Sequence, residues 1–343
     1  MISKADTTRL GNRLLSMDFG VCPTMFDYCL AMALLYFKEQ KCDVVILETG
    51  LGGTYDSTNA CGVPDVTVIA KIGFDHMAIL GDTLAKIAAE KAGIIKRGTA
   101  LVLESQEKEA MDVLNKAAER ADIKTTKVVN LDEIRILPQK DGKQCFSYAG
   151  YDAVTMKMLG VHQYENAVAA MLAAELFFEK YFAGKKSVPE RKALQHAIRE
   201  GIDRTQWMGR MELVSNDPFF LMDGAHNSNG VEALKKSLET MYPDEKFHFI
   251  MGVMADKDYG EMIRELLPLA LDFKTVTVES ERALQGEALA DCIRAKGIPA
   301  EAYRNLEDVL PDFSKSSAEK TVAFGSLYFI CLLYTSDAAD EAR

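Results

Sequence analysis

The sequence lacks a long hydrophobic run, an excess of basic residues and a signal-like N-terminus. No apolar stretch approaches the roughly 20 residues that a membrane-spanning helix needs, and the first residues show no basic-then-apolar pattern. The formal net charge of -11 argues against a broad nucleic-acid or anionic-membrane surface, because either partner would be repelled at long range. Small polyanionic ligands remain compatible with a local site. We therefore expect a cytoplasmic protein that binds neither nucleic acid nor membranes.

Paired cysteine motifs are also absent. The seven cysteines are scattered and odd in number, and no two of them form a CxxC pair. This pattern favours reduced thiols over a disulfide framework or a zinc site. We interpret all of them as packing residues: Cys22, Cys29, Cys42, Cys61, Cys145, Cys292 and Cys331.

The sequence does have the length and apolar content for two domains. The chain has 343 residues, of which 48% are hydrophobic. Its first half predicts, in order, a helix over 28–37, buried strands over 44–47 and 66–70, a helix over 84–95 and a strand over 100–103. This alternation is typical of an α/β domain with a mostly parallel, doubly wound sheet.

The α/β pattern begins again in the second half of the chain. Asp141-Gly142 indicates a hairpin, and helices are expected over 164–182 and up to about 200. After a junction at 201–209 we predict a smaller Rossmann-like domain, with strands over 219–222, 247–253, 275–278 and 321–324 and helices over 231–240, 259–267 and 286–296. The predicted domains are 1–203 and 204–333, followed by a disordered tail over 334–343.

Two strand ends carry candidates for a metal site. Glu48 follows the predicted strand over 44–47, and Asp75-His76 follows the next one, where open α/β sheets place ligands. A carboxylate and an imidazole together suit Mg²⁺ or Mn²⁺. Glu48 could equally be a helix cap or a salt-bridged loop residue, and a lone His76 would more often be a hydrogen-bonded loop residue.

Lys91 is the third candidate for this site. It lies seven residues after Leu84, on the apolar face of the helix predicted over 84–95. One explanation is snorkelling, in which the alkyl stem packs and the ammonium group reaches water. The other is that a neutral Lys91 reacts with CO₂ to form a carbamate, which is an anionic metal ligand.

Residues 223–227 are a candidate nucleotide site. The run DGAHN follows a predicted strand and opens a helix, which is where doubly wound sheets contact nucleotides. Asp223 could accept hydrogen bonds from ribose hydroxyls. The structural alternative is a loop in which Asn227 or Ser228 caps the following helix.

Together these segments resemble the folylpolyglutamate and dihydrofolate synthases of the Mur ligase family, over about 23–329. Residues 47–59 read LETGLGGTYDSTN and are similar to the family's EVGLGGRLDATN signature. The other matching blocks are TMFD at 24–27, DH at 75–76, LG at 80–81, EKAGI at 90–94, HQYENA at 162–167 and WMGRME at 207–212. A peptidoglycan-precursor Mur ligase would share the fold but would not be expected to carry the run at 51–59.

The resemblance implies an ATP-dependent ligase that phosphorylates the carboxylate of dihydropteroate or a reduced folate and joins the acyl phosphate to L-glutamate. The implied catalytic and metal-binding residues are Glu48, His76 and Lys91, with Lys91 as N6-carboxylysine and Mg²⁺ or Mn²⁺ as the metal. The implied nucleotide contacts are Asn166, Arg210, Asp223 and His226, and the implied substrate contacts are Thr24, Phe26 and Asp56. A monomer is expected.

The sequence departs from the family pattern in three places. No Gly-Thr-Asn-Gly-Lys-Gly-Ser P-loop precedes Pro23, so the β- and γ-phosphates would lose a backbone N–H cradle, which puts catalysis by this chain as written in question. Thr54 replaces the signature's arginine, and Asp27 replaces a glutamate. The alternative interpretation is a non-catalytic folate- or nucleotide-binding protein, but the retention of all three candidate metal ligands favours an enzyme.

Overall fold

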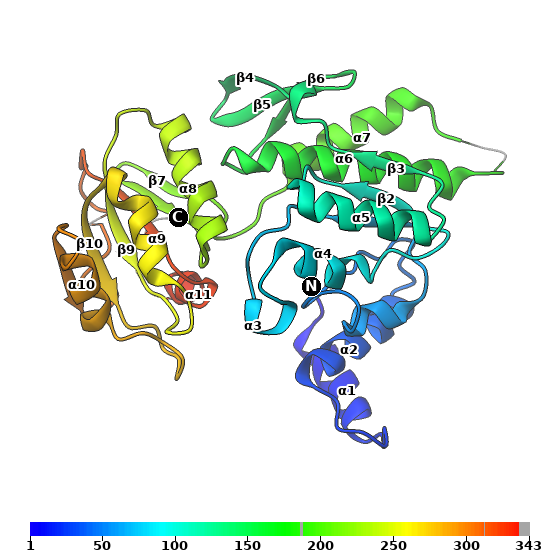
Figure 1. The fold of residues 1–343 in the computed structure, drawn as a ribbon, viewed down its shortest axis with the longest axis horizontal. Helices are drawn as coiled ribbons and strands as arrows, with labels where there is room; N and C mark the ends of the chain where they lie inside the picture. Colours follow the sequence, from blue (N-terminus) through cyan, green and yellow to red (C-terminus); the bar gives the residue numbers. More distant parts are fainter. Residues whose placement is uncertain (186–187, 312, 336–343) are drawn as a thin grey trace. The chain divides into compact units, whose positions relative to one another are not determined.

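The protein is described by a computed structural model that covers residues 1–185, 188–311 and 313–335. The chain divides into two compact units, and Figure 1 labels many of their elements. Unit 1 comprises Met1–Ile72 and His76–Val128, and unit 2 comprises Gly73–Asp75 and Val129–Arg343. The domain boundary predicted after residue 203 falls within unit 2 and stays a prediction about domain organisation.

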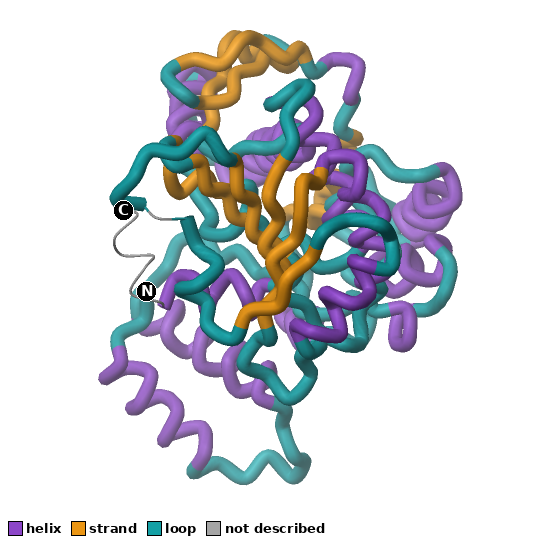
Figure 2. The backbone as a smooth tube through the Cα atoms, turned by 90° about the vertical axis from the view of Figure 1, so that its left-hand side faces the viewer, coloured by secondary structure: helices purple, strands orange, loops and turns teal. Residues whose placement is uncertain are grey.

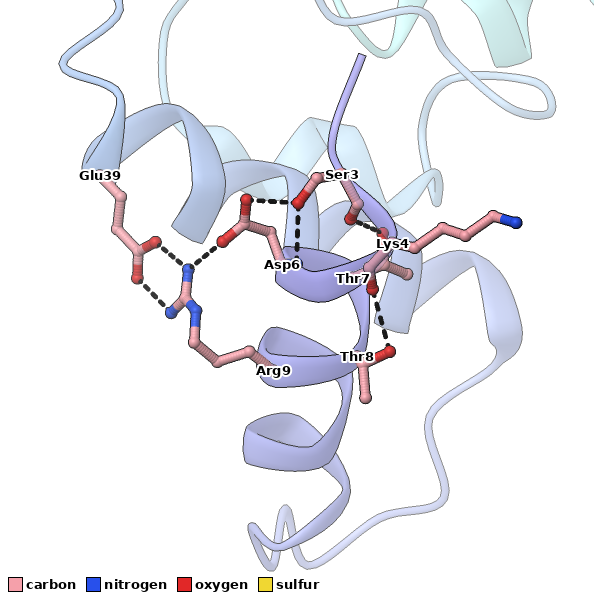
Figure 3. A network of polar contacts seen from close by, with 7 residues as sticks. All are labelled: Ser3, Lys4, Asp6, Thr7, Thr8, Arg9 and Glu39. Carbon is pink, nitrogen blue, oxygen red and sulfur yellow. Dashed lines mark hydrogen bonds and ion pairs between the residues drawn. The ribbon is translucent and has the colours of Figure 1, made fainter.

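Unit 1 opens with two helices that Arg9 ties together (Figure 3). Helix α1 (Lys4–Leu15) begins after Ser3, whose hydroxyl accepts a hydrogen bond from the Asp6 amide at 3.0 Å. Helix α2 (Met25–Glu39) ends at Glu39, and the Arg9 guanidinium donates to both oxygens of that carboxylate, at 2.6 and 3.1 Å. These bonds hold the pKa of Glu39 below its usual value. Because both side chains are exposed, the contact orients the helices more than it stabilises them.

The sheet of unit 1 is parallel and has the order β1-β2-β3, formed by Val66–Ile69, Ala100–Leu103 and Thr126–Val128. The connecting helices are η1 (Ser57–Cys61), α3 (Met77–Leu80), α4 (Leu84–Ala92) and α5 (Lys108–Arg120). The central strand β2 is buried along its whole length. It packs against the apolar faces of α4 and α5, to which Ile87 and Leu114 contribute fully buried side chains.

The predicted strand over 44–47 is wrong. These residues form no β-ladder in the described structure, and their apolar side chains are exposed, Ile46 to 91%. A short apolar run satisfies the sequence criterion for a buried strand, but a strand also needs a neighbouring strand for its backbone N–H and C=O groups. Glu48 therefore follows an unpaired extended segment and not a buried strand.

Unit 2 begins with an antiparallel sheet of order β4-β5-β6, formed by Arg135–Lys140, Lys143–Tyr148 and Tyr151–Met156 after a short 3-10 turn, η2 (Leu131–Glu133). The predicted hairpin is confirmed, because β4 and β5 pair across Asp141 and Gly142, which have φ values of 53° and 72°. Positive φ at both central residues is what a tight hairpin turn requires. Helices α6 (His162–Phe182) and α7 (Arg191–Arg204) follow.

The second sheet of unit 2 has the order β11-β10-β9-β12-β8-β7, and all pairs except β7 with β8 are parallel. Strands are drawn in orange in Figure 2. Its strands are β7 (Glu212–Asn216), β8 (Phe219–Met222), β9 (Phe247–Met251), β10 (Ala270–Val276), β11 (Ala300–Tyr303) and β12 (Lys320–Phe324). The helices are α8 (Ser228–Met241), α9 (Tyr259–Leu266), η3 (Leu267–Leu269), α10 (Gly286–Arg294) and α11 (Leu327–Thr335). The predicted Rossmann-like unit is confirmed, with β7 and β11 in addition.

Both faces of this sheet are covered. Along β8, Phe219 and Leu221 pack with α8, α9 and α10, whereas Phe220 and Met222 pack on the opposite face with α11. This alternation follows from the two-residue period of a strand. Because both faces are buried, the strand reads as one continuous apolar run in the sequence.

Three further expectations concern the cysteines, the tail and the membrane. All seven cysteines are free thiols, as predicted, but the packing role is wrong for most of them: Cys145 is buried and Cys292 half-buried, whereas the other five are exposed. Helix α11 includes Tyr334 and Thr335, which the sequence pattern places in the tail, and residues 336–343 lie outside the described residues. Among the helices that the structure describes, none is long and apolar enough to cross a membrane.

Candidate functional site

Unit 1 contains a cavity of about 600 Å³ next to the start of α2. Its wall comes from the loop over 50–57, from residues 79–80, from α4 and from the N-terminal end of α2. All three side chains predicted to contact the substrate, Thr24, Phe26 and Asp56, line this cavity. Residues more than thirty positions apart in the sequence are therefore gathered at one site.

Asp56 builds the loop that forms one wall of the cavity. One carboxylate oxygen accepts hydrogen bonds from the amides of Gly50 at 2.9 Å and Leu51 at 3.0 Å. The other accepts from the amide of Thr58 at 2.9 Å and from its hydroxyl. Burial opposes ionisation of this carboxyl, but the hydrogen bonds outweigh it and hold the pKa of Asp56 below its usual value. Both oxygens are thus occupied by the loop itself.

The start of α2 is fastened to the same loop. Thr24 and Asp27 form a capping box, in which each side chain accepts a hydrogen bond from the backbone amide of the other residue. Ser57 donates a further hydrogen bond to Asp27. The hydroxyls of Ser57 and Thr24 lower the pKa of Asp27, so a charged aspartate positions Phe26 at the wall of the cavity.

Two glycines let the loop pack tightly against its surroundings. A Cβ atom at Gly50 would lie 2.8 Å from two ring atoms of Phe26. A Cβ atom at Gly93 would lie 2.4 Å from the Cα of Thr54, whose amide donates to the Glu90 carbonyl at 2.9 Å. Glycine is therefore needed at position 50 because the backbone approaches the ring of Phe26, and at position 93 because the backbone approaches the backbone of Thr54.

The three candidate metal ligands all belong to unit 1. Glu48 and His76 are exposed, and Lys91 is half-buried in the last turn of α4. His76 is the N-cap of α3 and has a left-handed φ of 49°. Within the described ranges, no three His, Cys, Asp or Glu side chains are close enough to hold a metal ion. A site that also uses a carbamylated Lys91 stays a prediction.

Asp223 lies in unit 2 at the end of β8 and is only 6% exposed. Its two oxygens accept hydrogen bonds from the amides of Met211 and Ala225, both at 2.8 Å. Burial raises the pKa of Asp223, and the two amides and the nearby Arg210 oppose this shift. Asp223 thus connects the turn before β7 to the loop after β8, and the predicted helix cap is confirmed at Asn227, whose side chain accepts from the Gly230 amide.

Arg210 is held beside Gly224. A Cβ atom at Gly224 would lie 3.0 Å from a guanidinium nitrogen of Arg210 and closer still to Leu327. His162 lies close enough that burial and the Arg210 charge lower its pKa to about 4. His162 is therefore neutral near pH 7, and its buried Nδ1 atom has no hydrogen-bond partner among the described residues. No role for His162 was predicted from the sequence.

His226 contacts the short segment Gly73–Asp75, which belongs to unit 2. Its Nδ1 atom lies 2.9 Å from the Gly224 carbonyl, and its Nε2 atom lies 3.6 Å from Asp75. Asp75 also accepts hydrogen bonds from Asn227 at 2.8 Å and from Lys257 at 3.3 Å. Lys257, which lies in the DKD run at 256–258, was not predicted from the sequence as a site residue.

Asn166, the predicted adenine contact, lies in the first turns of α6 and is exposed. Its side-chain amide donates to Gln163 at 3.0 Å. The structure places Asn166, Arg210, Asp223 and His226 in the same unit. The last three lie close together through their neighbours. Asp223 accepts a hydrogen bond from the amide of Met211, which follows Arg210 in the chain, and Gly224 lies beside Arg210 and has its carbonyl 2.9 Å from His226 Nδ1.

Comparison with known proteins agrees with this arrangement. Residues 18–174 match the Mur ligase middle domain, and residues 209–324 match the Mur ligase glutamate ligase domain. The dihydrofolate synthase/folylpolyglutamate synthase of Bacillus subtilis is 35% identical over 320 residues, which cover 90% of this chain and 71% of that protein. The chain belongs to the folylpolyglutamate and dihydrofolate synthases of the Mur ligase family.

Other members of this synthase family are similar over different shares of their length. The folylpolyglutamate synthase of Lacticaseibacillus casei is 31% identical, and the match covers 73% of this chain and 56% of that protein. Among solved structures, the Mycobacterium tuberculosis folylpolyglutamate synthase complexed with ADP and AMPPCP superposes with a TM-score of 0.82 at 27% identity, covering 98% of this chain and 80% of the other. A folylpolyglutamate synthase–AMPPCP–folate complex superposes with a TM-score of 0.72 at 25% identity, covering 96% and 74%.

Proposed function

We propose that this chain is an ATP-dependent ligase that joins L-glutamate to the carboxylate of dihydropteroate or a folate through an acyl phosphate. The observation that carries the proposal is the cavity of unit 1, which brings Thr24, Phe26 and Asp56 together at one wall. Family membership supports it, since relatives bear the names of both synthases and one solved neighbour is a complex with folate.

Formation of the amide bond requires one activated carboxylate and one free amine. A carboxylate oxygen of the substrate attacks the γ-phosphorus of ATP, ADP leaves, and the amine of glutamate then displaces phosphate to form the amide. In the proposal, Arg210 and His226 stabilise phosphate charge, and Asn166 contacts the adenine. Asp223 acts by holding the backbone that carries Arg210, because its own oxygens are occupied by two amides.

A divalent cation belongs to the proposal as well. Mg²⁺ or Mn²⁺ bound with ATP supplies charge neutralisation on the phosphates. The donor chemistry fits, because Glu48 and His76 offer an oxygen and an imidazole that are exposed, and Mg²⁺ keeps several of its waters when it binds. Lys91 would join them as a carbamate. The protein's own residues would then hold the cation, orient the substrates and, through Arg210 and His226, stabilise phosphate charge.

The proposal also assigns an oligomeric state, a cellular location and a site for each of the two larger ligands. The protein acts as a monomer in the cytoplasm, where its free thiols stay reduced. The folate-side substrate occupies the cavity of unit 1 with its planar ring against Phe26. ATP is assigned to the residues of unit 2 named above.

A ligation assay on the full chain tests this proposal. ADP release would be measured with ATP and Mg²⁺ in the presence of dihydropteroate or tetrahydrofolate, with and without L-glutamate. We expect sustained ADP release only when the acceptor and glutamate are both present, and we expect Arg210→Ala to abolish it. Glutamate-independent ATP hydrolysis, or no turnover by a chain that binds both ATP and dihydropteroate, would contradict the ligase assignment.

A further inference from the structure

Asp75 lies in unit 2 against a group of nitrogen donors. One carboxylate oxygen accepts a hydrogen bond from the Asn227 side-chain amide at 2.8 Å and lies 3.6 Å from His226 Nε2. The other oxygen accepts from the Lys257 ammonium at 3.3 Å. Asn227 is also the N-cap of α8, a helix of 14 residues. An amide, an imidazole and an ammonium beside a helix N-terminus form a set of groups that suits an oxyanion. We call Asn227, His226 and Lys257 the oxyanion site.

Side chains of unit 2 hold the segment Gly73–Asp75 in this position. The Asn229 amide donates to the Phe74 carbonyl at 3.2 Å. A Cβ atom at Gly73 would lie 2.2 Å from Asn229 Nδ2, so glycine allows this close approach. Together with the bonds of the Asp75 carboxylate, these contacts seat the segment at the start of α8. Each of these hydrogen bonds has a side chain as its donor, so releasing the segment breaks no strand or helix.

Asp75 is the ion-pair partner of Lys257, although Lys257 lies between two aspartates in the sequence. Asp256 forms its ion pair with Arg282, at 2.7 Å. Asp258 is the N-cap of α9, and its carboxylate accepts a hydrogen bond from an amide of the first turn at 3.0 Å. The Lys257 side chain is only 17% exposed, and a charge so far removed from water needs a nearby anion. Asp75 supplies that anion.

We propose that Asp75 is an autoinhibitory anion, whose carboxylate occupies the oxyanion site until a phosphate group of the nucleotide displaces it. This inference rests on the proposed function, in which His226 stabilises phosphate charge. A phosphate group offers more oxygens and more negative charge than a carboxylate, so it can replace Asp75 on the same donors. Because Asp75 has to leave first, the apparent affinity for the nucleotide is reduced by the fraction of molecules in which the oxyanion site is open.

Equilibrium binding of ATP and adenosine to the full chain tests the proposal. Each ligand would displace a fluorescent ATP analogue, in the presence of EDTA, from the wild type and from Asp75→Asn. Asparagine keeps the shape of the side chain and an acceptor for Asn227, but it removes the charge that pairs with Lys257. We expect the variant to bind ATP about three- to ten-fold more tightly than the wild type. Adenosine carries no phosphate and should bind both proteins equally, which corrects for any loss of folded chain.

Glu265→Gln is the matched control, because Glu265 pairs with Lys235 at 3.2 Å and both side chains are exposed to a similar extent as those of Asp75 and Lys257. It removes the same charge from unit 2 and should leave ATP binding unchanged. The gain from Asp75→Asn should also shrink when Lys257 is replaced by methionine, since Asp75 then loses its ion-pair partner. An undiminished gain would contradict the assignment of Asp75 to the oxyanion site.

The outcomes separate this inference from the proposed function. If the wild type binds ATP and Asp75→Asn binds it equally or more weakly, the autoinhibitory role is refuted and the proposed function stands. An equal gain for adenosine, or an equal gain in Glu265→Gln, would also refute that role, because neither involves a phosphate group at the oxyanion site. If neither the wild type nor Asp75→Asn binds ATP, the nucleotide assignment is refuted, and the role of Asp75 with it.

Discussion

At the scale of single residues, the cavity of unit 1 depends on a few groups that are fixed by their own neighbours. Both carboxylate oxygens of Asp56 accept hydrogen bonds from the loop over 50–58. At the start of α2, Asp27 accepts a hydrogen bond from Ser57 of the same loop. Such pre-organised polar groups lose little freedom when a ligand binds. Thr24 and Asp56 therefore shape the wall of the cavity, and the substrate contacts that family resemblance implies for them stay predictions.

Gly50→Ala should damage the cavity because the added Cβ would lie 2.8 Å from ring atoms of Phe26. Overpacking of this kind costs about 1–3 kcal/mol when the ring has to move. We expect weaker pteroate binding and a lower free energy of unfolding, measured by fluorescence anisotropy and urea titration. Gly201→Ala is the control, since Gly201 lies in α7 and a Cβ atom there would meet nothing within 4 Å. Unchanged binding by Gly50→Ala would show that Phe26 is not held as described.

His162 should make the protein sensitive to acid. Burial and Arg210 lower its pKa to about 4 from an ordinary value of 6.5. Because the unfolded chain binds this proton at a higher pH than the folded chain, the stability contributed by the neutral imidazole is present above pH 6.5 and is lost as the pH falls through about 4. The loss amounts to roughly 3 kcal/mol.

Urea titrations of the wild type and of His162→Gln at neutral pH and near pH 4 isolate this contribution. The free energy of unfolding should fall less steeply in the variant, since glutamine does not titrate. Carboxylates elsewhere contribute equally to both proteins and cancel in the comparison. An identical fall in the two proteins would mean that His162 is not buried in its neutral form.

At the scale of elements, the sequence correctly predicted those strands and helices whose local pattern agrees with the packing partners that they have in the fold. Strand β8 and helix α8 were predicted nearly in full, because an apolar run and a capped amphipathic helix both pack on the same sheet. The segment over 44–47 has an equally good apolar pattern, but it pairs with no strand that the structure describes. Pairing is a long-range property, which a local pattern cannot supply.

The candidate site, too, was predicted from the sequence only in part. Motif resemblance identified Thr24, Phe26 and Asp56, and the structure brings them to one cavity. It did not reveal that both oxygens of Asp56 are occupied, because this depends on the path of the loop, which brings the amides of Gly50 and Leu51 to the Asp56 side chain. His162 and Lys257 were missed for a similar reason, since each is notable only through neighbours on other elements.

Asp223→Ala should loosen the connection between the turn before β7 and the end of β8. The substitution leaves the amides of Met211 and Ala225 without acceptors, and each unpaired buried amide costs about 1–3 kcal/mol. We expect a clear drop in the free energy of unfolding, measured by urea titration. Asp223→Asn keeps one acceptor oxygen and should be destabilised less. Equal stability of both variants and the wild type would contradict this connecting role.

At the scale of the whole molecule, the two units carry different parts of the proposed chemistry. Unit 1 contains the cavity and the candidate metal ligands, and unit 2 contains the residues assigned to the nucleotide. The net charge of -11 makes local positive groups such as Arg210 and Lys257 necessary for any anionic substrate. The central claim is that these groups serve an acyl phosphate reaction.

Oxygen isotope transfer tests that claim most directly. Dihydropteroate labelled with oxygen-18 in its carboxylate would be incubated with the full chain, ATP, Mg²⁺ and L-glutamate, and the inorganic phosphate would be analysed by mass spectrometry. If the carboxylate oxygen attacks the γ-phosphorus, each amide formed leaves one labelled oxygen in the released phosphate. Amide formation with unlabelled phosphate would contradict an acyl phosphate intermediate and, with it, the proposed mechanism.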